Sequence, residues 1–398
     1  MTLCERSACT GCGACANRCP KGAITMQPDE EGFLCPRIDP SACVDCGLCA
    51  KACPILTPPS RNPAQDQVYA AWATDISVRQ SSSSGGLYSV FAAEMLRRGG
   101  LVNGVAFDSE FNAVHRVCEQ ESELAPLRGS KYVQSDIRSA YKQAEDALKT
   151  GRPVLFTGTP CQVAGLKSFL GKDYPALVTC DFVCHGVPSP EFFKAALKDQ
   201  YGPVEREGSE FRFRNLVGWG FSPKLICADG KIRSRRTVDD YYYMAFLKGL
   251  NYRSSCYSCP YASFSRVTDL TIGDFWGIPI GFKVRHDMLT SGCSLLLLNS
   301  SKGRDFVTAV ADRIFMQKFQ ADICRENHQL YHPSSRPSCR DGFYADYKAM
   351  SRDQFLAKYS PHWRKPLGKR IREWVLWIPK KVMKVLLRYV GRLIWPNR

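Results

Sequence analysis

Apolar residues recur along residues 68–183 in two alternating patterns, short continuous runs and longer stretches with helical spacing. The short runs predict buried strands at 68–74, 101–107, 153–156 and 176–183. The helically spaced stretches cover 87–98, about 137–149 and a segment that ends at Leu170. Such alternation predicts a mostly parallel sheet, with functional loops at the carboxyl ends of its strands.

The pattern changes after residue 200. Short runs such as EFRFRN within 208–236 predict antiparallel strands, and a helix is predicted near 239–249. Residues 293–298 are a further buried strand by the same criterion, and 302–316 a helix. The fold expected for this part of the chain is therefore α/β with α+β elements.

The last segment, 366–398, has apolar residues near helical spacing with basic residues opposite them. Its longest uncharged run is far shorter than the roughly 20 residues that a membrane-spanning helix needs. A basic amphipathic helix with tryptophans suits an anionic bilayer surface, which would place the protein in the cytoplasm with peripheral contact to the inner face of the membrane. The pattern equally suits a helix docked on a partner or on the protein's own core, and both interpretations stay open.

Near the N-terminus the cysteine spacing CxxCxxCxxxCP occurs twice, from Cys9 and again from Cys43. Bacterial ferredoxins with two [4Fe–4S] clusters have this spacing, and the fourth cysteine of each run ligates the other cluster. Zinc knuckles and disulfide frameworks fit poorly, because neither requires a spaced quartet with a trailing proline. The predicted ligands are Cys9, Cys12, Cys15 and Cys53 for cluster I, and Cys43, Cys46, Cys49 and Cys19 for cluster II. We expect each cluster loop to be followed by a short helix and a strand.

Proline density at 57–63 (TPPSRNP) predicts a linker after this module. We therefore divide the chain into a ferredoxin domain at 1–60, a mixed α/β domain at 66–345 and the basic tail at 366–398.

Composition and charge narrow the functional classes. The 398 residues include 20 cysteines and carry a net charge of +16. Residues 365–398 account for +9, with ten Lys and Arg against one acid, Glu373. Because the excess is concentrated there and no nucleic-acid-binding signature occurs, nucleic acid is not an expected partner. With no signal peptide ahead of the first cysteines, we expect a reducing cytoplasm, and the oxygen sensitivity of such clusters suggests an anaerobe.

Four cysteines outside the ferredoxin domain stand in loops or in a CxxCP knuckle: Cys161, Cys184, Cys256 and Cys259. Thiolates need only converge in space to hold a third [4Fe–4S] cluster, but by spacing alone they are equally buried thiols beside an isolated CxxC. His185 follows Cys184 and is either a proton donor to substrate or a hydrogen-bonded loop histidine.

Clusters transfer single electrons, whereas most metabolites accept two, so a flavin is expected between them. The Ser/Gly-rich turn at 83–86 opens a helix, which suits a phosphate or is simply a serine-rich N-cap. The turn at 157–159 offers further contacts. Lys131 is the candidate catalytic cation beside the flavin N1/C2 edge, and a plain surface lysine is the alternative.

The motifs SSGG, GSKYVQS, TGTPCQ, CHGVPSP, CYSCP and DLTIGDFWG occur in this order over roughly 68–340. In this combination the chain resembles the coenzyme F420 hydrogenase/dehydrogenase beta-subunit family. The resemblance implies an FAD-containing α/β domain with a [4Fe–4S] cluster of its own, held by Cys161, Cys184, Cys256 and Cys259. The flavin contacts that it implies are Ser84, Gly85, Gly86, Lys131, Tyr132, Ser135, Thr157 and Thr159. Members of the family include deazaflavin enzymes and bacterial proteins encoded with polysaccharide genes.

Three functional hypotheses follow. The first is an enzyme that passes electrons between its ferredoxin clusters, a core cluster, FAD and an organic substrate, in either direction; the substrate is coenzyme F420 or another acceptor, such as one in polysaccharide biosynthesis. The second is a non-catalytic subunit that relays electrons to a partner oxidoreductase or ferredoxin. The third, an iron–sulfur redox sensor, predicts no flavin. Three cubanes predict about twelve irons.

Overall fold

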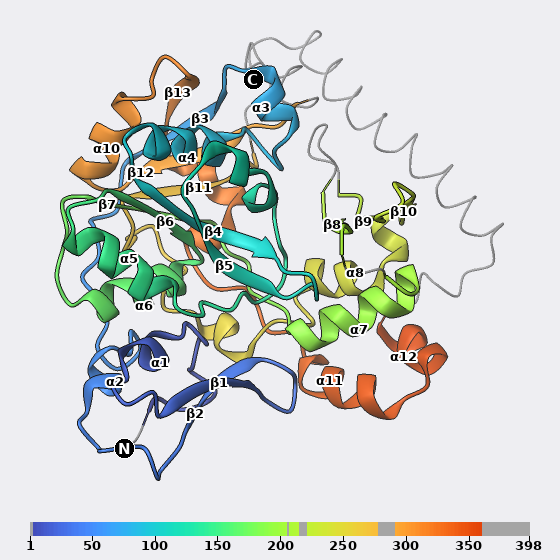
Figure 1. Cartoon of the computed structure of the whole chain (residues 1–398). Coiled ribbons are helices and arrows are strands. Elements are labelled where there is room, and N and C mark those ends of the chain that lie inside the picture. Colours follow the sequence, from blue (N-terminus) through green and yellow to red (C-terminus); the bar gives the residue numbers. More distant parts are fainter. Residues whose placement is uncertain (1–2, 205–206, 215–220, 278–290, 360–398) are drawn as a thin grey trace, which may run out of the picture. The chain divides into compact units, whose positions relative to one another are not determined.

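The computed structural model describes residues 3–204, 207–214, 221–277 and 291–359 (Figure 1). The chain forms two compact units, Met1–Asp341 and Gly342–Arg398. At and beyond their boundary lie α11 (Arg340–Ala349) and α12 (Arg352–Tyr359). The predicted amphipathic tail, 366–398, lies outside the described residues. None of the helices in the described part of the chain is long and apolar enough to cross a bilayer.

The ferredoxin region contains two short helices and one hairpin. These are α1 (Ala14–Arg18), β1 (Ile24–Pro28), β2 (Leu34–Ile38) and α2 (Leu48–Lys51). The two strands pair antiparallel, with Ile24 opposite Ile38. The expectation that a strand follows each cluster loop is wrong for the second loop, because β2 precedes it. A tight turn from Asp29 to Phe33 brings β2 back onto β1, and the proline-rich chain after Cys53 could not supply a continuous ladder of N–H donors.

One large mixed sheet forms the centre of the first unit. Its strands, in spatial order, are β13 (Ile314–Gln320), β3 (Gln67–Ala73), β12 (Ser294–Leu298), β11 (Leu270–Asp274), β7 (Leu177–Phe182), β6 (Val154–Gly158), β4 (Leu101–Phe107) and β5 (Ala113–Cys118). Only the central neighbours β11, β7, β6 and β4 pair parallel, and the outer pairs are antiparallel. The prediction of a mostly parallel sheet is therefore wrong: hairpin-type returns add antiparallel strands on both sides.

Helices cover both faces of this sheet. Leu155 of β6 packs with α4 (Leu87–Arg97) and α10 (Ser301–Thr308) in one apolar cluster. Its neighbours Val154 and Phe156 point to the opposite face, where α5 (Ala140–Lys149) and α6 (Pro160–Leu170) pack. This alternation is what a strand buried on both faces requires.

Outside the large sheet, β8 (Glu210–Arg212), β9 (Lys224–Ile226) and β10 (Ile232–Ser234) form the antiparallel sheet predicted within 208–236. The remaining helices are α3 (Ile76–Gln80), α7 (Pro190–Tyr201) and α8 (Tyr241–Leu247). Short 3₁₀ turns occur at Glu121–Glu123, Ala125–Leu127, Thr237–Asp239, Ser254–Ser258, Ala321–Glu326 and His328–Leu330.

Two helix boundaries differ from prediction. The helix predicted at 302–316 ends at Thr308, and Ile314–Gln320 is instead strand β13. β13 pairs along the whole length of β3, so the free edge of β3 overrides the apparent continuation of the helix. The helix predicted from about 137 begins at Ala140, because Asp136 exchanges backbone hydrogen bonds with the segment around Ala113 and His115.

Candidate functional site

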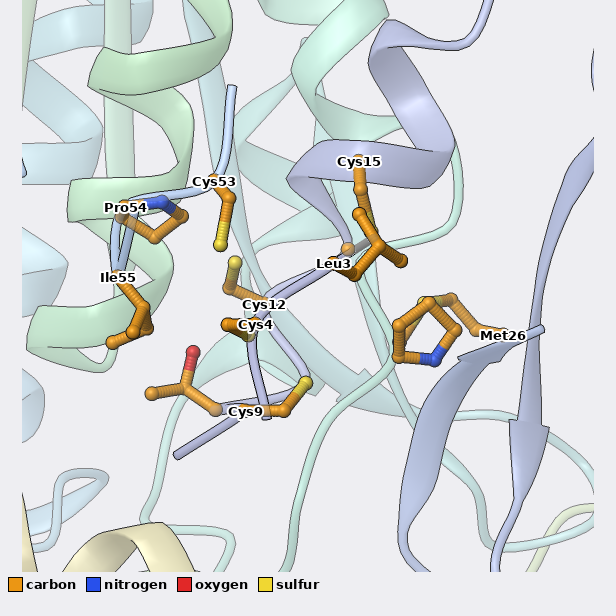
Figure 2. Close-up of a pocket in the computed structure, with 13 residues that line it drawn as sticks. Leu3, Cys4, Cys9, Cys12, Cys15, Met26, Cys53, Pro54 and Ile55 are labelled. Atoms are coloured by element: carbon orange, nitrogen blue, oxygen red, sulfur yellow. The ribbon is translucent and has the colours of Figure 1, made fainter. Parts of the chain in front are cut away.

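The first cysteine cavity lies in the ferredoxin region. Cys9, Cys12, Cys15 and Cys53 line it together with Cys4, and Figure 2 shows their side chains around the same space. The cavity encloses about 350 Å³, part of it open to solvent. The structure thus brings together the four residues predicted for cluster I and adds a fifth thiol that the spacing left unassigned.

The loop around this cavity depends on two glycines. Gly11 and Gly13 have φ of 67° and 71°, and Gly13 directly precedes α1. A Cβ on Gly11 would overlap the side-chain amide of Gln134 and the carbonyl of Leu34. The left-handed turn and the close approach explain why glycine separates the cysteines here.

The second cysteine cavity is lined by Cys19, Cys43, Cys46 and Cys49, the four residues predicted for cluster II. Its lining comes from the ferredoxin region alone. Cys46 is exposed, and the neighbouring Val44 side chain is 57% exposed. The cysteines of the second cavity are therefore more accessible than those of the first, where Cys9, Cys12 and Cys53 are buried.

The four cysteines of the larger domain converge from three segments. Cys161 lies in the first turn of α6, Cys184 follows β7, and Cys256 and Cys259 lie in and just after the 3₁₀ turn at Ser254–Ser258. Burial raises the pKa of Cys161 to about 11 and that of Cys256 to about 12. The pKa of Cys184 is raised by burial and then by the thiols of the other three, so the four lie close enough to interact electrostatically.

The four thiols are desolvated by the surrounding protein but are not fully buried. Protein surrounds them closely enough to desolvate them, and yet each retains accessible surface. That combination is expected of side chains that face a space within the fold. Within the described ranges, no three His, Cys, Asp or Glu side chains converge as ligands of a single metal ion. The sulfurs around a cubane bind different irons and so lie farther apart than single-ion ligands. The donor set therefore fits a cluster.

The predicted flavin residues lie along the carboxyl edge of the sheet. The turn at 83–86 follows β3, and 157–159 ends β6. The segment from Ser130 to Asp136 reaches both: the Ser130 N–H donates to Ser83 Oγ at 2.9 Å, and Ser135 O accepts at 3.2 Å from the Gln162 amide, which caps α6 with Thr159. The topology therefore gathers these residues at the edge where ligands bind in open α/β sheets.

Half of the predicted flavin residues are accessible and half are buried. Ser84, Lys131, Tyr132 and Thr157 keep accessible surface, whereas Gly85, Gly86, Ser135 and Thr159 are buried. The buried residues make hydrogen bonds or close contacts within the protein. The Gly85 N–H donates to Ser294 Oγ at 3.0 Å, and Ser135 Oγ accepts from the Gln162 amide at 2.9 Å. The Thr159 side chain caps α6 reciprocally with that of Gln162.

Lys131 is half-buried, and its Nζ donates to the carbonyls of Pro126 and Arg128 at 2.9 and 2.8 Å. Burial lowers the pKa of Lys131 to about 7. The Lys131 side chain can therefore exchange between ammonium and neutral amine near neutral pH, whereas an exposed lysine stays protonated there.

Two further residues of the predicted site share an aromatic neighbour. Tyr132 packs on Phe246, with ring centroids 4.4 Å apart, and the His185 ring lies 6.5 Å from the same phenylalanine. The imidazole is accessible to solvent, although the surrounding protein lowers its pKa by desolvation. His185 and Tyr132 therefore both lie near the Phe246 ring.

Sequence reasoning missed two buried cations near these residues. Arg214 is 4% exposed, and its Nη1 donates to Asp274 Oδ2 at 2.5 Å. Arg253 is also 4% exposed and contacts the ferredoxin region. Asp274 belongs to the DLTIGDFWG motif, so only the family resemblance could have signalled the first pair.

The N-terminal and C-terminal models of the coenzyme F420 hydrogenase/dehydrogenase beta subunit match residues 68–142 and 151–322, together more than half of the chain. The chain belongs to this family. Residues 8–55 match a 4Fe–4S dicluster domain, which confirms iron–sulfur clusters at the N-terminus. Membership in the family together with this domain indicates an electron-transfer role beside a redox partner.

Among solved structures, a chain of the F420-reducing [NiFe] hydrogenase complex from Methanosarcina barkeri is similar to this family member. The match covers 68% of this chain and 89% of that chain, at 15% identity and a TM-score of 0.46. No curated protein matches the sequence.

Proposed function

We propose that the chain is an iron–sulfur flavoprotein oxidoreductase that passes electrons between ferredoxin-type [4Fe–4S] clusters and an organic substrate through FAD. The proposed substrate is coenzyme F420 or another organic acceptor, such as one in polysaccharide biosynthesis. The observation that carries the proposal is the approach of the first cysteine cavity to the quartet of the larger domain. Clusters exchange single electrons and FAD exchanges one or two, so together they would join one-electron to two-electron chemistry.

Helix α6 connects the two sets of cysteines. Cys12 packs in the same apolar cluster as α5 and α6, and a Cβ built on Gly165 would lie 3.0 Å from Cys12 Sγ. Tyr141 OH lies 2.9 Å from the carbonyl of Cys12 and 2.7 Å from that of Gln162. Cys161 belongs to the first turn of the same helix. We therefore propose that electrons pass in sequence between the cluster at the second cavity, the cluster at the first cavity and the cluster at the Cys161 quartet.

The same geometry supports the ligand assignment. We propose one [4Fe–4S] cluster at each cavity of the ferredoxin domain and a third at Cys161, Cys184, Cys256 and Cys259. Their thiols repel one another as thiolates, and that repulsion is relieved when iron binds all four.

For FAD we propose direct contacts from the accessible residues Ser84, Lys131, Tyr132 and Thr157. The buried members of the predicted set, Gly85, Gly86, Ser135 and Thr159, shape the edge on which these contacts stand. As catalytic roles we propose that Lys131 holds a proton at Nζ beside the flavin and that His185 donates a proton to substrate. The lowered pKa of Lys131, about 7, supports proton exchange at neutral pH.

The test begins with anaerobically purified full-length protein. Iron and flavin are counted after denaturation, with about twelve irons per chain and one FAD expected. The protein is then reduced with dithionite and mixed with oxidised F420 in the absence of any partner. Single-turnover reduction of F420 supports the enzyme. Iron without flavin would instead indicate a redox sensor and overturn the proposal.

The exposed Val44 and Cys46 favour a second candidate, a non-catalytic subunit that relays electrons to a partner protein. An apolar side chain beside the most accessible thiol of the second cavity suits a transient docking surface. Tight co-purification with another oxidoreductase, and no single turnover with F420 or other organic acceptors, would favour this relay.

Membrane contact through residues 366–398 remains a separate proposal, supported by the basic, tryptophan-containing sequence alone. Deleting the segment should abolish sedimentation with anionic liposomes. Unchanged sedimentation would contradict the proposal.

A further inference from the structure

A buried guanidinium joins the ferredoxin region to the knuckle that carries Cys256. Arg253 stands three residues before that cysteine and is 4% exposed. Its three nitrogens each have an acceptor in the ferredoxin region. Nε donates to Cys9 O at 2.6 Å, Nη1 to Leu34 O at 3.0 Å and Nη2 to Cys35 Sγ at 3.0 Å. The side chain therefore fixes two segments of the ferredoxin region, the loop at Cys9 and the start of β2, against the larger domain.

Within the described ranges, this cation has no carboxylate partner. Among the residues that the structure describes, Arg253 makes no ion pair, and besides these acceptors its guanidinium lies over the Phe33 ring, 5.6 Å from the centroid. Although burial lowers the pKa of Arg253, the thiols of Cys9, Cys35 and Cys256 raise it overall. A buried charge without a counter-ion is costly, so a negative group in this region would compensate for it.

Two of those thiols belong to different proposed clusters. Cys9 lines the first cavity, and Cys256 belongs to the quartet of the larger domain. The Arg253 carbonyl also accepts from the Cys256 N–H at 2.9 Å, so the residue contacts the quartet directly. No other arginine of the described chain donates to the backbone of a cysteine at the first cavity.

We propose that Arg253 is a positioning residue that supplies a counter-charge shared by the clusters at the first cavity and at the Cys161 quartet, and that it raises the reduction potential of both. The proposal rests on the function proposed above. Cluster potentials depend on net charge, hydrogen bonding and burial. A fixed cation in a buried setting favours the state with one more electron, and it does so more strongly there than in water.

The second cavity provides an internal control. Its lining residues all come from Cys19–Cys49, and the three hydrogen bonds from the Arg253 guanidinium go to other residues. Arg61 provides a matched external control, since its Nη2 donates to Pro260 O at 2.8 Å, beside Cys259, but the side chain is exposed. Solvent screens that charge, so its removal should leave the potentials unchanged.

The experiment is a redox titration of the anaerobic full-length protein, followed by electron paramagnetic resonance. Wild type is compared with Arg253→Gln, Arg253→Lys and Arg61→Gln. Cys46→Ser, which alters a proposed ligand at the second cavity, identifies the signal of that cluster. Iron content and thermal stability are measured on every variant.

We expect Arg253→Gln to lower both the first-cavity and the quartet potentials by at least a tenfold change in the reduction equilibrium, about 59 mV for one electron. Arg253→Lys, which keeps the charge, should stay within that limit, and the second-cavity signal should not move. Equal shifts of the reduction potentials in both Arg253 variants, or no shift in Arg253→Gln, would mean that Arg253 has only a structural role and would overturn the proposal.

Where Arg253→Gln fails to retain iron, Arg253→Lys decides: a potential more than tenfold below wild type overturns the proposal, and one within that range supports it. Failure of the proposed function is visible separately, because wild-type protein would then lack flavin or the third cluster. The potential of the first-cavity cluster in the Arg253 variants would still test the effect of the arginine on that cluster.

Discussion

The buried pair of Asp181 and Arg266 provides a quantitative test of how the Cys161 quartet is positioned. Their side chains are 0% and 1% exposed, and Arg266 Nη2 donates to Asp181 Oδ2 at 2.7 Å. Asp181 ends the buried part of β7, three residues before Cys184, and Thr271 of β11 donates to its other oxygen at 2.6 Å. Arg266 also donates to the carbonyl of Tyr261, just after Cys259. The pair therefore ties two segments that carry quartet cysteines.

The perturbation is Asp181→Asn, which keeps the shape of the side chain and removes its charge. Burial raises the pKa of Asp181, and Arg266 opposes that rise. The pair as a whole should add little stability, because the cost of desolvating two buried charges offsets their attraction. The cost of the substitution comes from stranding the arginine, about 3–5 kcal/mol. For a large domain this corresponds to a fall in Tm of about 6–10 °C.

The assay is thermal unfolding of the anaerobic holoprotein at one fixed scan rate, with iron counted on each preparation. Asp229→Asn is the control, because its partner Lys231 is also 2.7 Å away but the two side chains are 48% and 79% exposed. That change should leave Tm nearly unchanged, because solvent screens the exposed pair. In Asp181→Leu combined with Arg266→Met, much of the lost stability should return. If Asp181→Asn and Asp229→Asn lower Tm equally, the stranded-charge reasoning is refuted.

Three further outcomes are expected. Glu94 has a fully buried side chain, and hydrogen bonds from arginines, the one from Arg97 foremost, hold its pKa at about 2. Its contribution is present above about pH 4.5 and lost as the pH falls toward 2, so Glu94→Gln should cost about 2 kcal/mol at pH 7 by thermal unfolding, and a cost that persists at pH 2 would contradict this. Because the pKa of Lys131 is lowered to about 7, the unfolded chain binds a proton that the folded chain lacks between pH 7 and 10.5. Stability should therefore rise with pH over that range in wild type and rise less in Lys131→Met. Parallel profiles of Tm against pH in the two proteins would count against a lowered pKa of Lys131. In Gly165→Ala the new Cβ would lie 2.8 Å from Tyr141 OH and 3.0 Å from Cys12 Sγ, so about 1–3 kcal/mol of overpacking should exceed the gain of about 1 kcal/mol in helix propensity, and the first-cavity spectrum should change; an unperturbed spectrum would argue against contact between α6 and that cavity.

The sequence alone determined the features that depend on local spacing. The two CxxCxxCxxxCP runs gave both cavity linings, including the exchange of Cys19 and Cys53 between them. Strand 101–107 and the antiparallel strands within 208–236 also followed from apolar pattern. Such features are predictable because the residues that cause them are neighbours in the chain.

Only the tertiary structure decided features in which distant segments compete for the same hydrogen bonds or the same space. Residues 314–320 pair with the edge of β3 as a strand. The Gly85 N–H, which the sequence predicted as a phosphate contact, instead donates to Ser294 Oγ. The approach of Cys12 to α6 and the contacts of Arg253 likewise join residues more than a hundred positions apart. Spacing cannot encode such pairings, because a buried donor or cation finds its partner only when the whole chain has packed.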